Sequence, residues 1–133
     1  DYCTCGQHGC VEAYCAGTAL SKNYKKLTGD ELTGEQILKR IDKDPKAKEV
    51  LESYQEDLAY FLTSLRNIFD PEVIVIGGGV IYSKDIWWEG MIEKFNDICN
   101  NTINISVMPA KFLNDSGVIG AGKIAFERIE DGK

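Results

Sequence analysis

Three cysteines crowd into the start of the sequence, where Cys3, Cys5 and Cys10 lie within eight residues and are separated by glycines. Thiols at this close spacing are poor disulfide partners and good metal ligands. The glycines allow the backbone to turn back on itself, as a loop around a tetrahedral ion requires. The cluster therefore predicts a zinc site with Cys3, Cys5 and Cys10 as ligands. The alternatives are reduced structural thiols or a redox pair.

The residues alone leave two questions open, namely the identity of the fourth zinc ligand and the role of Glu12, the next carboxylate in the sequence. A structural zinc has four ligands, so His8, Cys15 or a residue upstream of the sequence would complete the site. His8 lies in the tight turn between Cys5 and Cys10, where strain disfavours ligation, so we expect it to be a loop residue. Glu12 falls in the first turn of a predicted helix, whose positive end favours a carboxylate. On these residues alone, that charge complementarity is the preferred role of Glu12.

Helical periodicity dominates the sequence as far as residue 70. Apolar residues at three- and four-residue spacing predict a helix from Val11 to about Lys26, with Gly29 as its C-cap. Thr33 and Gln36 form the pattern of a capping box at the start of a second, short helix. The first part of the chain is therefore expected to be helical.

The longest predicted helix has clear signals at both ends. Asp44 and Pro45 supply an N-cap and a proline at the first helical position. The apolar stripe continues to Phe69, and Asp70-Pro71 ends the helix. Its apolar face is wide enough to pack on a sheet.

An alternation of strands and helices is predicted for the remainder. The apolar β-branched run Val73–Ile76 predicts a buried parallel strand that leads into the glycine turn 77–79. A helix over about 84–99 follows, then a strand through Ile103, Ile105 and Val107, then a helix over about 117–128. This order predicts an α/β layered domain.

Two adjacent tryptophans lie in the predicted helix 84–99. Trp88 falls on the apolar stripe of that helix and is expected in the core. Trp87 falls beside the stripe and is the candidate for an interface with another molecule. An oligomerisation module stabilised by zinc is accordingly the simplest structural interpretation of the chain.

Size and charge limit the functions that this segment can have. The 133 residues suffice for one domain, and no long uncharged apolar run or secretion signal is present. We therefore expect a soluble, cytoplasmic protein. The net charge is −6 and the lysines are scattered, which argues against nucleic-acid binding by this segment.

The cysteine pattern has a specific likeness. Cys3-x-Cys5-Gly6-x-x-Gly9-Cys10-x-Glu12, followed by Ala16-Gly17, resembles the second signature of the ROK family. This family contains bacterial glucokinases, N-acetylhexosamine kinases, fructokinases and sugar-responsive repressors. Residues 70–79 are similar to the family's adenosine segment, and residues 115–121 are similar to a segment near its C-terminal end.

The resemblance implies an actin-like ATPase fold of two ribonuclease H-like lobes, with residues 1–133 as most of the second lobe, truncated at its N-terminus. A zinc loop would occupy residues 1–12, a helical part 13–70 and a nucleotide-side βαβα part 71–133. In the family, the cysteines of this motif bind zinc together with an upstream histidine, so Cys3, Cys5 and Cys10 are the implied ligands. The glutamate after the last cysteine binds sugar hydroxyls, which implies that role for Glu12.

The resemblance also implies a site for ATP. The family context assigns nucleotide contact to Gly77, Gly78 and Gly79, where the missing side chains let a nucleotide approach the backbone. On the residues alone, these glycines form an ordinary strand-to-helix turn. No Gly-Lys-Ser or Gly-Lys-Thr follows, so the segment is not a Walker loop.

Two parts of the family's active site have no counterpart in residues 1–133. The phosphate-binding Asp-x-Gly-Gly-Thr is missing, and so is the aspartate that acts as general base on the sugar. We therefore expect the C-terminal part of an ATP- and magnesium-dependent kinase for glucose or a related hexose or N-acetylhexosamine, inactive as an isolated chain. The resemblance implies a homodimer. The alternative is the sugar-sensing lobe of a ROK transcriptional repressor.

Overall fold

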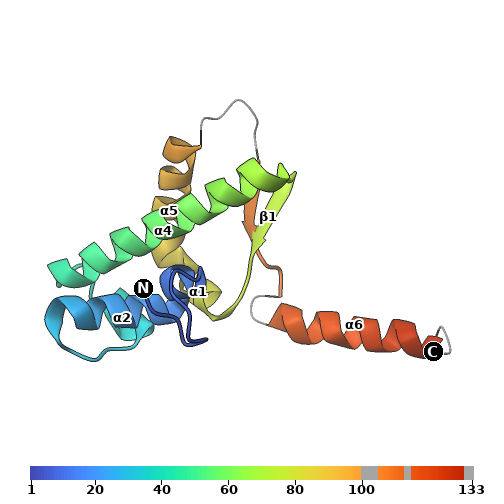
Figure 1. Cartoon of the computed structure of the whole chain (residues 1–133), viewed down its shortest axis with the longest axis horizontal. Helices are drawn as coiled ribbons and strands as arrows, with labels where there is room; N and C mark the ends of the chain where they lie inside the picture. Colours follow the sequence, from blue (N-terminus) through green and yellow to red (C-terminus); the bar gives the residue numbers. More distant parts are fainter. Residues whose placement is uncertain (100–104, 113–114, 131–133) are drawn as a thin grey trace.

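The computed structural model describes residues 1–99, 105–112 and 115–130, and is mostly helical with one small parallel sheet (Figure 1). None of its helices has the length and apolar character needed to cross a bilayer within these ranges. In chain order, the elements are α1 (Glu12–Cys15), α2 (Gly17–Thr28), α3 (Gly34–Leu38), α4 (Pro45–Phe69), β1 (Val73–Ile76), the 3₁₀ helix η1 (Gly79–Ser83), α5 (Lys84–Ile98), β2 (Ser106–Pro109) and α6 (Ser116–Glu130).

The first predicted helix is divided into α1 and α2. Ala16 has φ −86° and ψ 158°, an extended conformation that interrupts the helix. The carbonyl of Cys15 accepts a hydrogen bond from the hydroxyl of Tyr54 in α4 at 3.2 Å. The partner that stabilises this break is 39 residues away in the sequence, so the local apolar pattern could not predict the break. The predicted C-cap is confirmed, because Gly29 has φ 83° and its N–H donates to the carbonyl of Lys25.

The predicted caps of α3 and α4 are confirmed. Both hydrogen bonds of the Thr33–Gln36 capping box form, at 3.2 and 3.0 Å. Asp44 accepts from two backbone N–H groups in the first turn of α4 and from the hydroxyl of Tyr24 at 2.6 Å. This last hydrogen bond is the main reason why the pKa of Asp44 is lowered. Asp70 ends α4 in the left-handed conformation, with φ 43°.

The core lies between α4 and α5, with α2 and α3 packed against α4. Figure 1 shows α4 and α5 crossing in the middle of the molecule. The largest fully buried side chains come from these elements and from η1: Trp87, Tyr54, Phe95, Leu20, Ile37, Leu62, Ile81 and Met91.

The prediction for the two tryptophans was wrong. Trp87 is fully buried, whereas Trp88 is only half-buried at the edge of the core. The indole N–H of Trp87 donates to the carbonyl of Val80 at 3.2 Å, and its ring meets that of Tyr54 edge to face. The buried stripe of α5 therefore runs through Trp87, Met91 and Phe95, four residues apart. Trp87 has no surface left for another molecule.

A glycine in α5 allows α4 to approach closely. A Cβ atom on Gly90 would lie 2.5 Å from the Gln55 side-chain nitrogen. That nitrogen donates to the carbonyl of Trp87 at 3.0 Å, and Gln55 is buried. We expect Gly90→Ala to lower the free energy of unfolding by about 1–3 kcal/mol, because Gln55 must move away from its partner.

Gly120 in α6 is the matched control for Gly90. A Cβ atom there would meet nothing within 4 Å. Alanine is the better helix former, so Gly120→Ala should raise the free energy of unfolding by up to about 1 kcal/mol or leave it unchanged. Urea unfolding followed by circular dichroism measures both variants. A Gly90→Ala protein as stable as the wild type would contradict the close packing of α4 on α5.

The strands β1 and β2 pair in parallel, as predicted, with Val73 opposite Ser106 and Ile76 opposite Pro109. The prediction of a fully buried strand was wrong, because Val73 is 43% and Val75 56% exposed. Side chains alternate across a strand, so only Ile74 and Ile76 reach the core. Ile105 and Val107 also pack against the core, while the predicted strand residue Ile103 lies outside the described residues.

The last helix, α6, extends away from the other elements in Figure 1. Its apolar residues are on the surface: Val118, Ile119, Ile124, Phe126 and Ile129 are all exposed. Exposed apolar surface of this extent is characteristic of a surface that contacts another part of a protein or a partner, rather than of a solvent-exposed surface.

Candidate metal and substrate site

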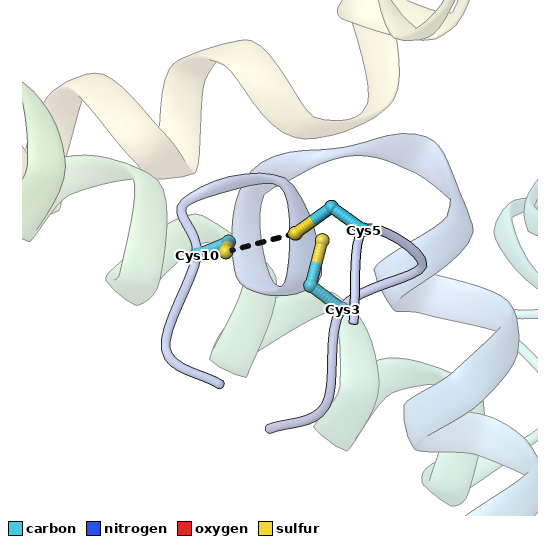
Figure 2. A group of neighbouring side chains, drawn as sticks. All are labelled: Cys3, Cys5 and Cys10. Carbon is cyan, nitrogen blue, oxygen red and sulfur yellow. Dashed lines mark hydrogen bonds between the residues drawn. The ribbon is translucent and has the colours of Figure 1, made fainter. Parts of the chain in front are cut away.

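The three predicted metal ligands come together at the start of the chain (Figure 2). The Sγ atoms of Cys3, Cys5 and Cys10 all lie within 4.8 Å of one another, and those of Cys5 and Cys10 are 3.6 Å apart. Gly6 and Gly9 have φ 89° and 78°, left-handed values that favour glycine and that fold the loop back on itself.

The loop gives the three thiols different surroundings. Cys3 is buried, Cys10 is half-buried and Cys5 is exposed. Hydrogen bonds from the backbone and side chain of Cys5 lower the pKa of Cys3, whereas the hydrogen bond with Cys5 is the main cause that raises the pKa of Cys10 to about 11. The loop therefore makes the thiol of Cys3 more acidic than that of Cys10.

The other two candidates for the fourth ligand lie outside the cluster. Among the described residues, the group that could hold a metal contains three thiols and no histidine. His8 is exposed and its ring lies edge to face with that of Tyr2, at 5.3 Å between centroids. Cys15 packs against the core, and burial raises the pKa of its thiol to about 11.

Glu12 lies directly beside the cluster. It is the first residue of α1, as predicted, and its side chain is exposed. The thiol of Cys3 donates to Oε2 of Glu12 across 3.9 Å. The loop and the carboxylate are therefore in contact, and the backbone of the loop continues directly into the helix that carries Glu12.

The predicted glycines after β1 have different roles in the structure. Gly78 has φ 93°, which accounts for a glycine in the turn. Gly79 begins η1 and lines a pocket of about 1090 Å³. A Cβ atom on Gly79 would meet nothing within 4 Å, so the pocket is open at this point. Neither Gly77 nor Gly78 is among the described residues that line it.

The walls of this pocket were not predicted from the sequence. They come from α2, from α3 with the segment before it, and from η1 with the start of α5. Gly17 and Gly34 allow these walls to meet, because a Cβ atom on Gly34 would lie 3.1 Å from the carbonyl oxygen of Gly17. Gly17 in turn faces Val80 of η1. In the sequence, the close approach of α2, α3 and η1 is indicated only by these two glycines, which begin α2 and α3.

The cysteine loop, Glu12 and the glycine turn all fall within one stretch that matches the profile of the ROK family, residues 1–128. The chain belongs to the ROK family. It is 28% identical over 122 residues to the N-acetylmannosamine kinase of Vibrio cholerae, and 28% identical over 128 residues to the N-acetyl-D-glucosamine kinase of Histophilus somni. These matches cover 90% and 95% of the chain.

The fold is that of ROK sugar kinases. The structure matches the ROK hexokinase of Thermus thermophilus over 98% of the chain, with a TM-score of 0.85 and 27% sequence identity. The match covers 45% of that hexokinase, and the chain spans 41% and 42% of the two curated kinases. The ROK chain thus corresponds to less than half the length of these relatives.

Proposed function

We propose that the chain is the C-terminal part of an ATP-dependent sugar kinase that acts on a hexose or an N-acetylhexosamine. The observation that carries this proposal is the contact between Glu12 and the thiol cluster, 3.9 Å from Oε2 to the Sγ of Cys3. A carboxylate binds sugar hydroxyls strongly when its orientation is fixed, and a metal-clamped loop would fix it. The two curated kinases compared above act on N-acetylated sugars, which supports this substrate class.

The thiol cluster is proposed to hold a structural zinc ion. Zinc–sulfur bonds of about 2.3 Å in tetrahedral geometry separate two ligand sulfurs by about 3.8 Å. The 3.6 Å between the Sγ atoms of Cys5 and Cys10 is close to this value, and the third sulfur lies within 4.8 Å. One ion can therefore contact Cys3, Cys5 and Cys10 after small movements. The bound ion would supply structural constraint to the loop, and no chemistry in phosphoryl transfer is assigned to it.

The metal content of the complete protein tests this site. We expect about one zinc per protomer in the wild type and a loss of at least about tenfold in zinc affinity in Cys10→Ser, because the ion loses a thiolate ligand. Competition with a chromophoric chelator measures the affinity. Cys15→Ser is the control, since Cys15 lies outside the cluster, and it should retain the metal. Wild-type protein purified without stoichiometric zinc would contradict the proposal.

The pocket beside Gly79 is proposed to take the adenosine part of ATP. A strand, a glycine turn and a helix lead into this pocket, an arrangement that lets a nucleotide approach the backbone. The phosphate-binding segment, the base that deprotonates the sugar and the groups that position magnesium would come from another part of the complete protein. Within the proposal, this chain orients the sugar through Glu12 and holds one end of the nucleotide.

Phosphorylation assays distinguish the proposed kinase from its alternative. The complete protein should transfer phosphate from ATP to one or more of glucose, mannose, fructose and their N-acetylamino relatives. Residues 1–133 alone should transfer none, because neither the phosphate loop nor the base is among them. Sequence-specific DNA binding by the complete protein, without turnover of any sugar, would instead support the sugar-sensing lobe of a repressor.

A further inference from the structure

The pocket beside Gly79 is lined by apolar as well as charged side chains. Leu20, Leu38, Val80 and Ile86 contribute apolar side chains to its lining. At about 1090 Å³, it has room for a nucleoside, since pockets for organic ligands of that size range from about 300 to 1,000 Å³.

Four of the five charged residues that line this pocket are paired with one another. Lys25 forms an ion pair with Glu31, and Lys39 forms one with Glu35 at 2.6 Å. The fifth, Lys22, donates to the carbonyl of Tyr2 at 3.3 Å. A phosphate group at Lys25 or Lys39 would have to displace these carboxylates, whereas an uncharged base and sugar would not. The paired part of the lining, together with the apolar side chains, therefore favours the nucleoside end of a nucleotide.

Two hydroxyl groups on α2 face no partner among the described residues. Thr28, Thr63 and Ser64 each donate a hydrogen bond to the carbonyl four residues earlier, at 2.9 Å. Thr18 and Ser21 have no such bond within the part of the chain that the structure describes, and both line the pocket. Their hydroxyls are therefore available to a ligand as donors and acceptors.

Tyr82 is an aromatic residue whose position the fold does not explain. Its side chain is 62% exposed and lines the pocket from η1, three residues after Gly79. The hydroxyls of the buried Tyr24 and Tyr54 donate to Asp44 and to the carbonyl of Cys15. Tyr82 has no hydrogen bond of this kind to any described residue. Burial and hydrogen bonding, which account for the other two tyrosines, do not account for this one.

We propose that Tyr82 is the surface on which the nucleotide base stacks, with the hydroxyls of Thr18 and Ser21 as the hydrogen-bonding groups of the same site. This inference rests on the proposed function, in which the pocket takes adenosine. Every base has an aromatic face, so stacking on Tyr82 would strengthen binding of purine nucleosides with little selection between them. Tyr82 would then position the base, and specificity for adenine would depend on the hydroxyls of α2.

Nucleoside titrations of residues 1–133, followed by nuclear magnetic resonance, test this proposal. The probes are adenosine, guanosine and free ribose, with the amide signals of Gly79 and Val80 as reporters. Tyr82→Ala should weaken adenosine and guanosine alike by roughly tenfold, the loss that one base–aromatic stack implies, and should not change ribose binding. Tyr82→Phe keeps the aromatic face and should retain affinity within about twofold. Tyr60→Ala is the matched control, because Tyr60 is 53% exposed on α4 and does not line the pocket.

The outcomes separate the inference from the function on which it rests. If adenosine shifts the signals of Gly79 and Val80 equally in the wild type and in Tyr82→Ala, the pocket binds nucleoside and the role of Tyr82 is overturned. If adenosine shifts neither signal in the wild type, the assignment of the pocket to ATP fails, and the role of Tyr82 fails with it. An equal loss in Tyr82→Phe and Tyr82→Ala would place the effect on the hydroxyl and would also overturn stacking.

Discussion

Trp87→Ala is expected to lower the free energy of unfolding by about 3–5 kcal/mol, the usual cost of removing a large aromatic side chain from a core. Trp87 is fully buried, and its ring packs edge to face against Tyr54 of α4. The substitution also leaves the carbonyl of Val80 without the indole N–H that it accepts. Since domains of this size are typically stable by only about 5–15 kcal/mol, the substitution should remove a large part of the total stability.

Urea unfolding followed by far-ultraviolet circular dichroism measures this effect in residues 1–133. Phe126→Ala is the control on α6, where the side chain is 71% exposed, and it should change the free energy of unfolding by less than about 0.5 kcal/mol. The neighbouring Trp88→Ala should cost less than Trp87→Ala, because Trp88 is only half-buried. A larger loss from Trp88→Ala would contradict the orientation of α5.

Glu12→Gln in the complete protein is expected to lower kcat/KM for the sugar by roughly 10- to 100-fold, the range for loss of a charged hydrogen-bond acceptor. The reason is the proposed contact of the Glu12 carboxylate with sugar hydroxyls. Glutamine has the same shape without the charge, so the loop and α1 should be unaffected. Because Glu12 is exposed, the free energy of unfolding should not change.

Steady-state assays over a range of sugar concentrations measure this loss, with ATP held in excess. Glu52→Gln is the control, since Glu52 is an exposed residue of α4 whose nearest cation, Lys48, is 3.9 Å away. This control should retain the wild-type kcat/KM. If Glu12→Gln phosphorylates sugar as efficiently as Glu52→Gln, Glu12 does not bind the sugar.

Local patterns predicted the helices well because their signals are local. The capping box at Thr33 and Gln36 and the N-cap at Asp44 satisfy backbone groups within a few residues, so their function does not depend on the remainder of the fold. The break at Ala16 has no such signal. It frees a carbonyl for Tyr54, a residue 39 positions further along the chain, and periodicity cannot register a partner at that distance.

Burial was harder to predict than secondary structure. The apolar pattern of a helix does not determine which of two adjacent residues is buried. In α5, the face that carries Gly90 packs closely on α4, and Trp87 rather than Trp88 is in the core. The apolar run of β1 predicted a strand correctly, but it carries no information on which neighbours cover each face. Val75 is 56% exposed in this chain for that reason.

In the candidate site, the cysteine cluster could be predicted from the sequence and the pocket could not. The spacing of Cys3, Cys5 and Cys10 along the sequence was enough to predict that their sulfurs meet, because the loop that joins them is short and contains glycines. The pocket beside Gly79 could not be predicted, since Ser21 and Tyr82 come from elements that are far apart in the sequence. Only the fold brings these residues to one cavity.

The dissociation constant of the sugar, measured in a double-mutant cycle of Cys10→Ser and Glu12→Gln on the complete protein, tests most directly whether a metal-clamped loop orients the sugar-binding carboxylate. If the metal acts through Glu12, each single substitution should weaken sugar binding by roughly tenfold or more, and the double variant should bind no more weakly than the weaker single. A metal-free Cys10→Ser protein that binds sugar with wild-type affinity would contradict the account.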